Sequence, residues 1–138
     1  MHTYIALLLG INIGGARLLP MKELAALLQD LGCRDVRTYI QGGNAVFASP
    51  EPDSAKLAAA ISAEIKSRRG FEPQVLLLTR AEFEQAIAAN PFPEAQSDPQ
   101  SLHLGFLAVE PPVPNLAGIE KRRAASERWQ LIGRVFYL

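Results

Sequence analysis

The sequence predicts an α+β fold, and three observations support it. Short apolar runs of strand length alternate along the chain with longer segments in which leucine or isoleucine recurs every three to four residues, as on one face of a helix. Two strand-like runs flank the tripeptide Gly-Gly-Asn, a pattern typical of an antiparallel hairpin. The chain has 138 residues, which suits one ordinary domain or two small units.

The first half contains six expected elements, and their order specifies the fold. Pro20 suits the first turn of a helix and Gly32 suits its C-terminal cap, while Asp53 or Ser54 can cap a second helix that Gly70 ends. The order β-α-β-β-α-β matches the ferredoxin-like motif with its antiparallel sheet. The expected elements are a central strand at 4–9, a helix at 20–32, strands at 36–40 and 45–49, a helix at 53–69 and a strand at 73–79.

The second half predicts another α/β unit. Thr79 and Glu82 have the spacing of a capping box, so a helix should run from there to about Asn90. A strand at 101–109, a short helix near 115–125 and two strands reversing at Gly133-Arg134 follow. We therefore expect a ferredoxin-like unit over 1–79 and a second, incomplete α/β half-domain over 80–138. Because the last strand is apolar and has no polar tail, the second half is expected to be truncated at its C-terminus.

Composition disfavours several classes of function. Lys plus Arg equals Asp plus Glu, 14 against 14, so no overall field attracts nucleic acid. The longest apolar run is far shorter than the roughly 20 residues of a membrane span, and no secretory signal is visible, so we expect a cytoplasmic protein with no membrane contact. Cys33 is the only cysteine, and His2 and His103 form no metal-binding pattern. We expect no metal and no cofactor, and no residue can be assigned a catalytic role.

One edge of the predicted sheet gathers polar residues. In an antiparallel sheet of strand order 4-1-3-2, the first two strands point the same way, so the loops that follow them lie at one end. The link before the fourth strand, with Arg68 and Arg69 beside it, should lie there too. The resulting candidate ligand-binding residues are Asn12, Gly14, Gly15, Arg17, Gln41, Gly43 and Asn44.

The glycine pattern of this edge restricts its chemistry. Gly10 and Gly15 have the separation of a P-loop, but Ala16 and Arg17 stand where Lys and Ser or Thr are required. The dinucleotide pattern Gly-x-Gly-x-x-Gly is also absent. Exposed N–H groups leading into a helix start, with Arg17 beside them, would still suit an anion. The alternative is that the glycines only permit tight turns and that Asn12 and Asn44 satisfy main-chain groups.

Several stretches also carry a family resemblance. They are YIALLLGINIGG, LPMKEL, DVRTYIQGGNAVFAS, NPFPEA, SLHLGFL and GRVFYL, in that order. Together they are similar to the bacterial family named domain of unknown function 1697, over nearly the whole chain. The resemblance implies a ferredoxin-like architecture with a related second half, and no assigned activity.

The chain departs from the pattern of that family at the candidate edge. Members usually carry Arg in place of Leu9, Lys or His in place of Ala16, and Ser in place of Gly42, so this chain has fewer donors and charges there. Members also continue past the final Tyr-Leu into a segment with an Arg-Asn-Trp-like motif, so the resemblance implies either that the chain is truncated here or that the site is incomplete.

Together these observations favour a non-catalytic binding module for a small anionic or nucleotide-like ligand at the glycine-rich edge. Two alternatives stay open: an unrecognised enzyme of small-molecule metabolism that uses Arg17 and Asn12 as donors, and a structural domain that self-associates, for example as a homodimer through sheet edges. Binding of single-stranded nucleic acid by aromatics such as Tyr39 and Phe47 is disfavoured, because few basic residues surround them.

Overall fold

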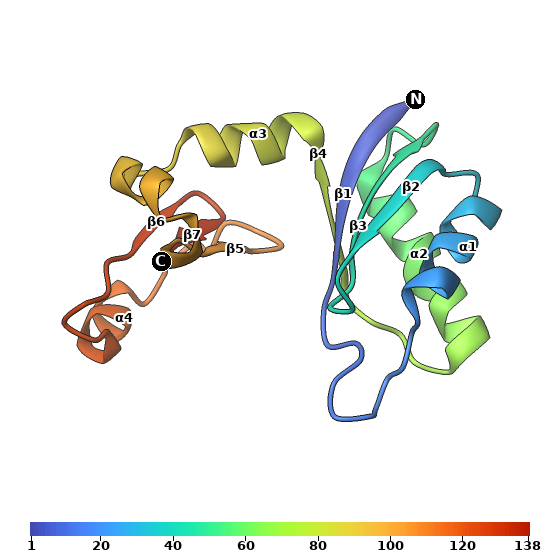
Figure 1. Ribbon diagram of the computed structural model, residues 1–138, viewed down its shortest axis with the longest axis horizontal. Coiled ribbons are helices and arrows are strands. Elements are labelled where there is room, and N and C mark those ends of the chain that lie inside the picture. The colour runs from blue at the N-terminus through green and yellow to red at the C-terminus, as the bar shows by residue number, and fades with distance from the viewer. The chain divides into compact units, whose positions relative to one another are not determined.

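The computed structural model describes residues 1–138 as two compact units, Met1–Glu84 and Gln85–Leu138, which we call unit 1 and unit 2 (Figure 1). The fold is mixed α+β, with four helices, a four-stranded antiparallel sheet and a separate three-stranded sheet. The α+β class expected from the sequence is therefore confirmed. None of the helices has both the length and the apolar character of a membrane span.

Unit 1 is built on the four-stranded sheet. Its strands lie in the order β2-β3-β1-β4, and each neighbouring pair is antiparallel. The apolar run at 4–9 falls mainly in β1, which lies between β3 and β4, so the expected central strand is confirmed. The elements are β1 (His2–Leu8), α1 (Met21–Asp30), β2 (Arg34–Tyr39), β3 (Asn44–Ser49), α2 (Ser54–Arg69) and β4 (Val75–Thr79).

The core of unit 1 lies between the sheet and its two helices. Both α1 and α2 cover the same face of the sheet (Figure 1). Alternation along β1 directs Tyr4, Ala6 and Leu8 into this core, while Ile5 and Leu7 on the other face are half-buried. The apolar stripes predicted for the helices are buried, with Leu24, Leu27 and Leu28 on α1 and Leu57, Ile61 and Ile65 on α2.

Local sequence signals set the helix ends. The Asp53 carboxylate accepts hydrogen bonds from the N–H groups of Ala55 (3.1 Å) and Lys56 (3.2 Å), so Asp53 is the N-cap of α2. Gly70 ends that helix with a φ of 81°. The capping box is also confirmed, because the Thr79 hydroxyl accepts from Glu82 N–H and a Glu82 carboxylate oxygen accepts from Thr79 N–H, each at 3.1 Å.

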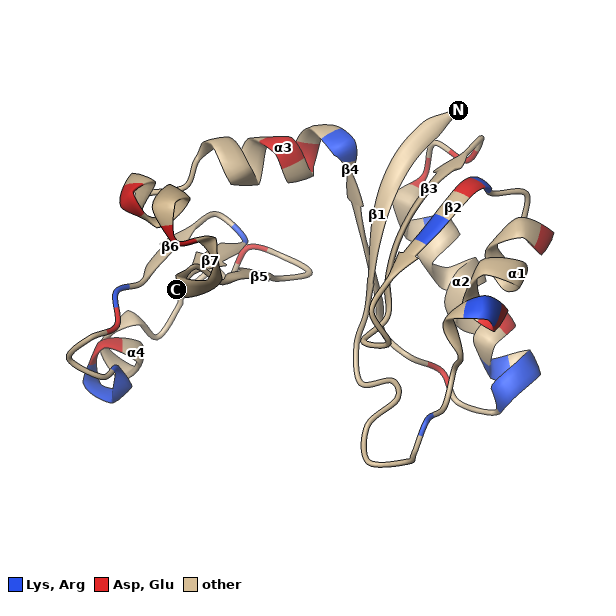
Figure 2. Ribbon diagram, in the orientation of Figure 1, with Lys and Arg blue, Asp and Glu red and all other residues tan.

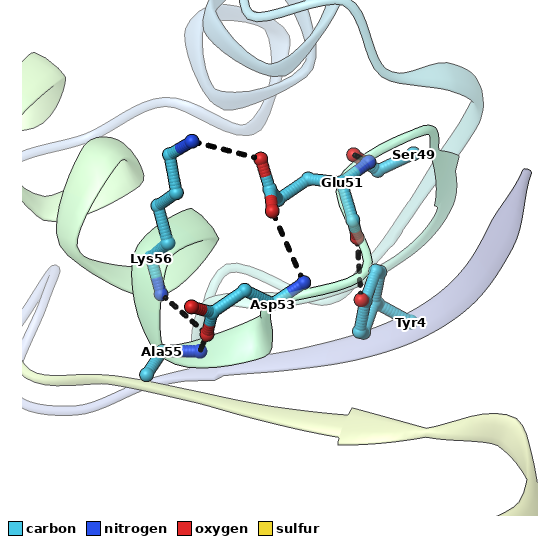
Figure 3. Close-up of polar contacts among 6 residues, drawn as sticks. All are labelled: Tyr4, Ser49, Glu51, Asp53, Ala55 and Lys56. Carbon is cyan, nitrogen blue, oxygen red and sulfur yellow. Dashed lines mark hydrogen bonds and ion pairs between the residues drawn. The ribbon is translucent and has the colours of Figure 1, made fainter.

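A polar corner joins the central strand to the start of α2 (Figure 3). The Tyr4 hydroxyl donates to the main-chain carbonyl of Glu51 at 2.6 Å, and Glu51 N–H donates to the Ser49 hydroxyl at 3.2 Å. The Glu51 carboxylate accepts from Asp53 N–H (3.1 Å) and pairs with Lys56 (3.4 Å). Burial raises the pKa of Tyr4, and the charges of Glu51 and Asp53 raise it further. Tyr4 therefore stays protonated and acts as a hydrogen-bond donor.

Unit 2 contains a small sheet of strand order β5-β7-β6. The strand expected over 101–109 is much shorter, because its partner β7 has only three residues and Ser101 belongs to a 3₁₀ turn. The reversal at Gly133-Arg134 is confirmed. The elements are α3 (Arg80–Ala88), which begins in unit 1, 3₁₀ turns at Pro93–Ser97 and Pro99–Ser101, β5 (Leu104–Phe106), α4 (Leu116–Arg122), β6 (Gln130–Ile132) and β7 (Val135–Tyr137).

The packing of unit 2 depends on aromatic residues. Tyr137 is buried, and its hydroxyl donates to the main-chain carbonyl of Ala86 at 2.5 Å. Trp129 and Phe136 stack on each other, with ring centroids 6.0 Å apart and planes inclined by 14°. These rings therefore pack within unit 2.

We expect Tyr4→Phe to lower the free energy of unfolding by about 1 kcal/mol, because the ring stays in place and only the hydrogen bond to Glu51 is lost. Tyr39→Phe is the matched control, since Tyr39 is exposed and its hydroxyl makes no hydrogen bond in the protein. Chemical denaturation of both variants measures the difference. Equal stability of the two variants would contradict the role given to the Tyr4 hydroxyl.

Candidate functional site at the loop edge of unit 1

Strand direction brings three separate segments together at one end of the sheet. Strands β1 and β2 are both antiparallel to β3, so they run the same way and end at the same edge, where β4 begins. The main chain joins the segments: Leu8 N–H donates to the Gly43 carbonyl (2.8 Å) and Leu9 N–H donates to the Gln74 carbonyl (3.0 Å). We call residues 9–19, 39–44 and 71–74 the loop edge. The expected convergence of these segments is confirmed.

The stretch GINIGG is part of a small β-hairpin. Ala16 N–H donates to the Ile13 carbonyl and Asn12 N–H donates to the Arg17 carbonyl, each at 2.9 Å. At the tip, Gly14 and Gly15 have φ values of 58° and 75°, which are those of a type I′ turn. The helix start expected at Pro20 is confirmed, because α1 begins at Met21, and the hairpin lies between β1 and that helix.

The side chain of Asn12 organises the edge. Its Nδ2 donates to the Leu19 carbonyl at 2.9 Å and to the Gln41 carbonyl at 2.7 Å, and its Oδ1 accepts from Leu19 N–H at 2.7 Å. Asn12 has a φ of 53°, a conformation that Asn tolerates better than most residues. The amide thus closes the base of the hairpin and ties it to the turn after β2. We call this arrangement the Asn12 clamp.

Close packing beneath the hairpin fixes the second turn. Ile11 and Leu19 at the hairpin base are buried. A Cβ atom on Gly43 would lie 2.8 Å from Ile11 Cδ1 and 2.9 Å from Leu8 Cβ, and the φ of Gly43 is 92°. Only glycine meets both conditions, since a side chain would clash and would also be strained at that φ. At the start of the same turn Ile40 has a φ of 51°, which is costly for a β-branched residue.

Arg17 is the only charged side chain in residues 9–19 and 40–44. Figure 2 shows this as one short basic stretch in an otherwise uncharged loop after β1. Its guanidinium lies 5.2 Å from the centroid of the Phe71 ring, a distance at which cation–π attraction operates. Its Nη2 also lies 3.5 Å from the Glu72 carbonyl, a long hydrogen bond. The other guanidinium donors are exposed and have no partner in the protein.

The remaining candidate residues hold the edge together. Gln41 accepts the Asn12 hydrogen bond through its main-chain carbonyl, and Asn44 Nδ2 donates to the Tyr39 carbonyl at 3.3 Å. The two arginines expected nearby are engaged with carboxylates on the helices. Arg68 contacts Asp30 (2.7 Å) and Glu64 (2.8 Å), and Arg69 pairs with Glu23.

The loop edge also exposes large apolar side chains, which sequence reasoning missed as a group. The exposed fractions run from 51% to 74%. Their positions in the sequence indicate this exposure, since most of them lie beside a glycine or at a turn, where a side chain is difficult to bury. They are Leu9, Ile13, Leu18, Tyr39 and Ile40.

Cys33 does not belong to the loop edge. It is buried among the core residues of unit 1. Burial raises the pKa of the thiol, although a hydrogen bond with the Ser49 side chain partly opposes this. A buried thiol with a raised pKa is a poor nucleophile, which agrees with a packing role.

We expect Gly43→Ala to lower the free energy of unfolding by about 2 to 4 kcal/mol, through the positive φ and the collision with Ile11 and Leu8. Gly42→Ala is the matched control, because a Cβ there meets nothing closer than 3.7 Å, and its effect should stay within about 1 kcal/mol. Thermal or chemical denaturation compares the two. Similar losses in both variants would contradict the account of this turn.

Comparison with known proteins places the chain in a family. A family model described as "Protein of unknown function (DUF1697)" matches residues 1–137. Among solved structures, the conserved bacterial protein SP0830 from Streptococcus pneumoniae is similar, with 24% sequence identity and a TM-score of 0.74, and the alignment covers 99% of this chain and 76% of that one. At this identity the likeness concerns the fold alone. No curated protein matches the chain. The chain belongs to the family of proteins of unknown function designated DUF1697.

Proposed function

We propose that this protein is a non-catalytic binding module and that the loop edge of unit 1 binds a small anionic or nucleotide-like ligand. The observation that carries the proposal is the tip of the hairpin. The N–H groups of Gly14 and Gly15 have no acceptor in the protein, and the partly unpaired guanidinium of Arg17 follows two residues later. Such N–H groups beside a cation suit a phosphate or carboxylate oxygen.

In this proposal the seven candidate residues divide into two groups. Gly14, Gly15 and Arg17 contact the ligand, because their donors are available. Asn12 and Gly43 give the edge its shape, together with Gln41 and Asn44, because their hydrogen bonds and packing are directed into the protein. We also infer that unit 1 is a ferredoxin-like βαββαβ fold, an assignment supported by its strand order β2-β3-β1-β4.

The apolar surroundings favour a ligand with a planar or apolar part. Tyr39 is 74% exposed and Ile13 is 64% exposed, both at the same edge as Arg17. An aromatic ring of this exposure offers a stacking surface to a base. A phosphate bound at the hairpin tip and a base against these side chains would account for the free N–H groups beside Arg17 and for the exposed apolar side chains.

The residues of the two loops after β1 and β2 favour binding without catalysis. Residues 9–19 and 40–44 contain no His, Asp, Glu, Cys, Lys or Tyr side chain, and Arg17 is the only ionisable group among them. General acid–base catalysis requires a group that exchanges a proton near neutral pH, and an arginine side chain stays charged. The alternative of an unrecognised enzyme therefore lacks a proton-transfer group in these two loops, and would have to use Glu72 or Tyr39 at the rest of the edge.

Self-association is a second candidate function. The observation that favours it is the set of exposed apolar side chains at the loop edge, since such clusters mark interaction surfaces in soluble domains. In this case a second copy of the chain, and not a small molecule, would cover Ile13, Leu18 and Ile40.

An NMR titration with inorganic phosphate and adenosine monophosphate tests the proposal. The amide signals of Gly14 and Gly15 should shift on addition of either ligand, with tighter binding of the nucleotide. Arg17→Gln should weaken binding about tenfold, because a charge-assisted contact is lost. Arg37→Gln, which removes an exposed charge from β2, is the matched control and should bind as the unchanged protein does.

Shifts that are absent, or that are the same in Arg17→Gln, would reject the anion site. If the same samples then sediment as dimers whose formation is prevented by Ile13→Ser, the edge serves self-association instead. If the dimer still forms in Ile13→Ser, the exposed apolar residues of the loop edge do not mediate self-association either.

A further inference from the structure

Unit 2 contains a cavity that the proposed function of unit 1 does not use. Its volume is about 390 Å³, within the range typical of small-molecule sites. Three segments line it: residues 92–95, 101–103 and 126–128, together with the C-terminal Leu138. All of them belong to unit 2.

The lining combines an apolar part with charged groups. Phe92, Leu102 and Leu138 supply the apolar part, and Glu94, Glu127 and Arg128 supply the charges. Small-molecule sites commonly have this composition, in which an apolar surface binds the body of a ligand and a few polar groups orient it.

An ion pair already compensates the charge of Arg128, the cation of the cavity. The guanidinium of Arg128 lies over the Phe92 ring, 4.6 Å from its centroid, and it also pairs with the Glu94 carboxylate. A hydrogen bond from its own main chain lowers the pKa of Glu94, and the contact with Arg128 lowers it further, so Glu94 is ionised at neutral pH. An anionic ligand that approaches Arg128 would therefore meet the charge of Glu94 as well.

The Glu127 carboxylate is only partly satisfied. Its Oε1 accepts from Ala124 N–H at 2.6 Å, while Oε2 has no partner in the protein. The nearby Arg123 reaches Glu127 through the main-chain carbonyl alone, at 3.0 Å, and its Nε is engaged by Glu120 at 2.6 Å. With two carboxylates and one guanidinium, the charged side chains of the cavity sum to one negative charge.

We propose that this cavity binds a small organic amine, with the ammonium group on Glu127 Oε2 and the apolar body against Phe92, Leu102 and Leu138. An ammonium donor completes the hydrogen bonding of Glu127 and compensates the excess negative charge without breaking the Arg128–Glu94 pair. The site is independent of the loop edge, so either proposal can fail alone.

Three ligands of the same size test the charge requirement on the whole chain: phenethylamine, 2-phenylethanol and phenylacetate. In NMR titrations phenethylamine should shift the amide signals of residues 92–95, 101–103 and 126–128. The alcohol should bind about tenfold more weakly and phenylacetate more weakly still, because only the amine carries the complementary charge. Equal or tighter binding of phenylacetate, or no shift with phenethylamine, would overturn the proposal.

A charge-removing variant tests the role of Glu127. In Glu127→Gln the side-chain carbonyl can still accept from Ala124 N–H, so the local fold is kept while the charge is lost. Phenethylamine affinity should fall about tenfold in this variant. Glu110→Gln, an exposed position of unit 2 outside the cavity, is the matched control and should leave the affinity unchanged. An unchanged affinity in a folded Glu127→Gln protein would also overturn the proposal, and the ligand series decides it if that variant fails to fold.

Discussion

The Asn12 clamp is the constraint on which the loop edge depends. The loop between β1 and α1 has only the short ladder of its hairpin, and its other main-chain groups need partners. One amide side chain provides three hydrogen bonds, two within the loop and one to the turn after β2. Because segments 29 residues apart in sequence are joined in this way, the position of the hairpin is tied to the sheet. The glycine tip and Arg17 belong to this hairpin, so their position is tied to the sheet as well.

The clamp also explains why the edge resembles a ligand loop without matching a known phosphate motif. A P-loop surrounds its phosphate with consecutive N–H groups and a lysine. Here the glycines form a two-residue turn at the end of a hairpin, and their N–H groups have no acceptor in the protein.

The sequence predicted those features that depend on local or topological rules. The Asp53 cap, the Thr79–Glu82 capping box and the stripe of Leu57, Ile61 and Ile65 follow from spacing within one helix. The meeting of the loops at one edge follows from the direction of the strands. These predictions succeed because each depends on periodicity, capping chemistry or strand order, all of which the sequence displays.

Other features depend on three-dimensional contacts that no spacing rule reveals. The sequence left two roles open for Asn12, as a ligand contact or as a partner of main-chain groups, and its amide is directed to the main chain of Leu19 and Gln41. The contact of Arg17 with Phe71 joins residues far apart in sequence. The cavity of unit 2 is lined by turns without periodicity, so no pattern in the sequence predicts it.

The most direct test of the Asn12 clamp is the NMR spectrum of Asn12→Ala. We expect shifted amide signals in both 11–19 and 40–44, with the strand signals preserved. Changes confined to 11–19 would contradict the clamp.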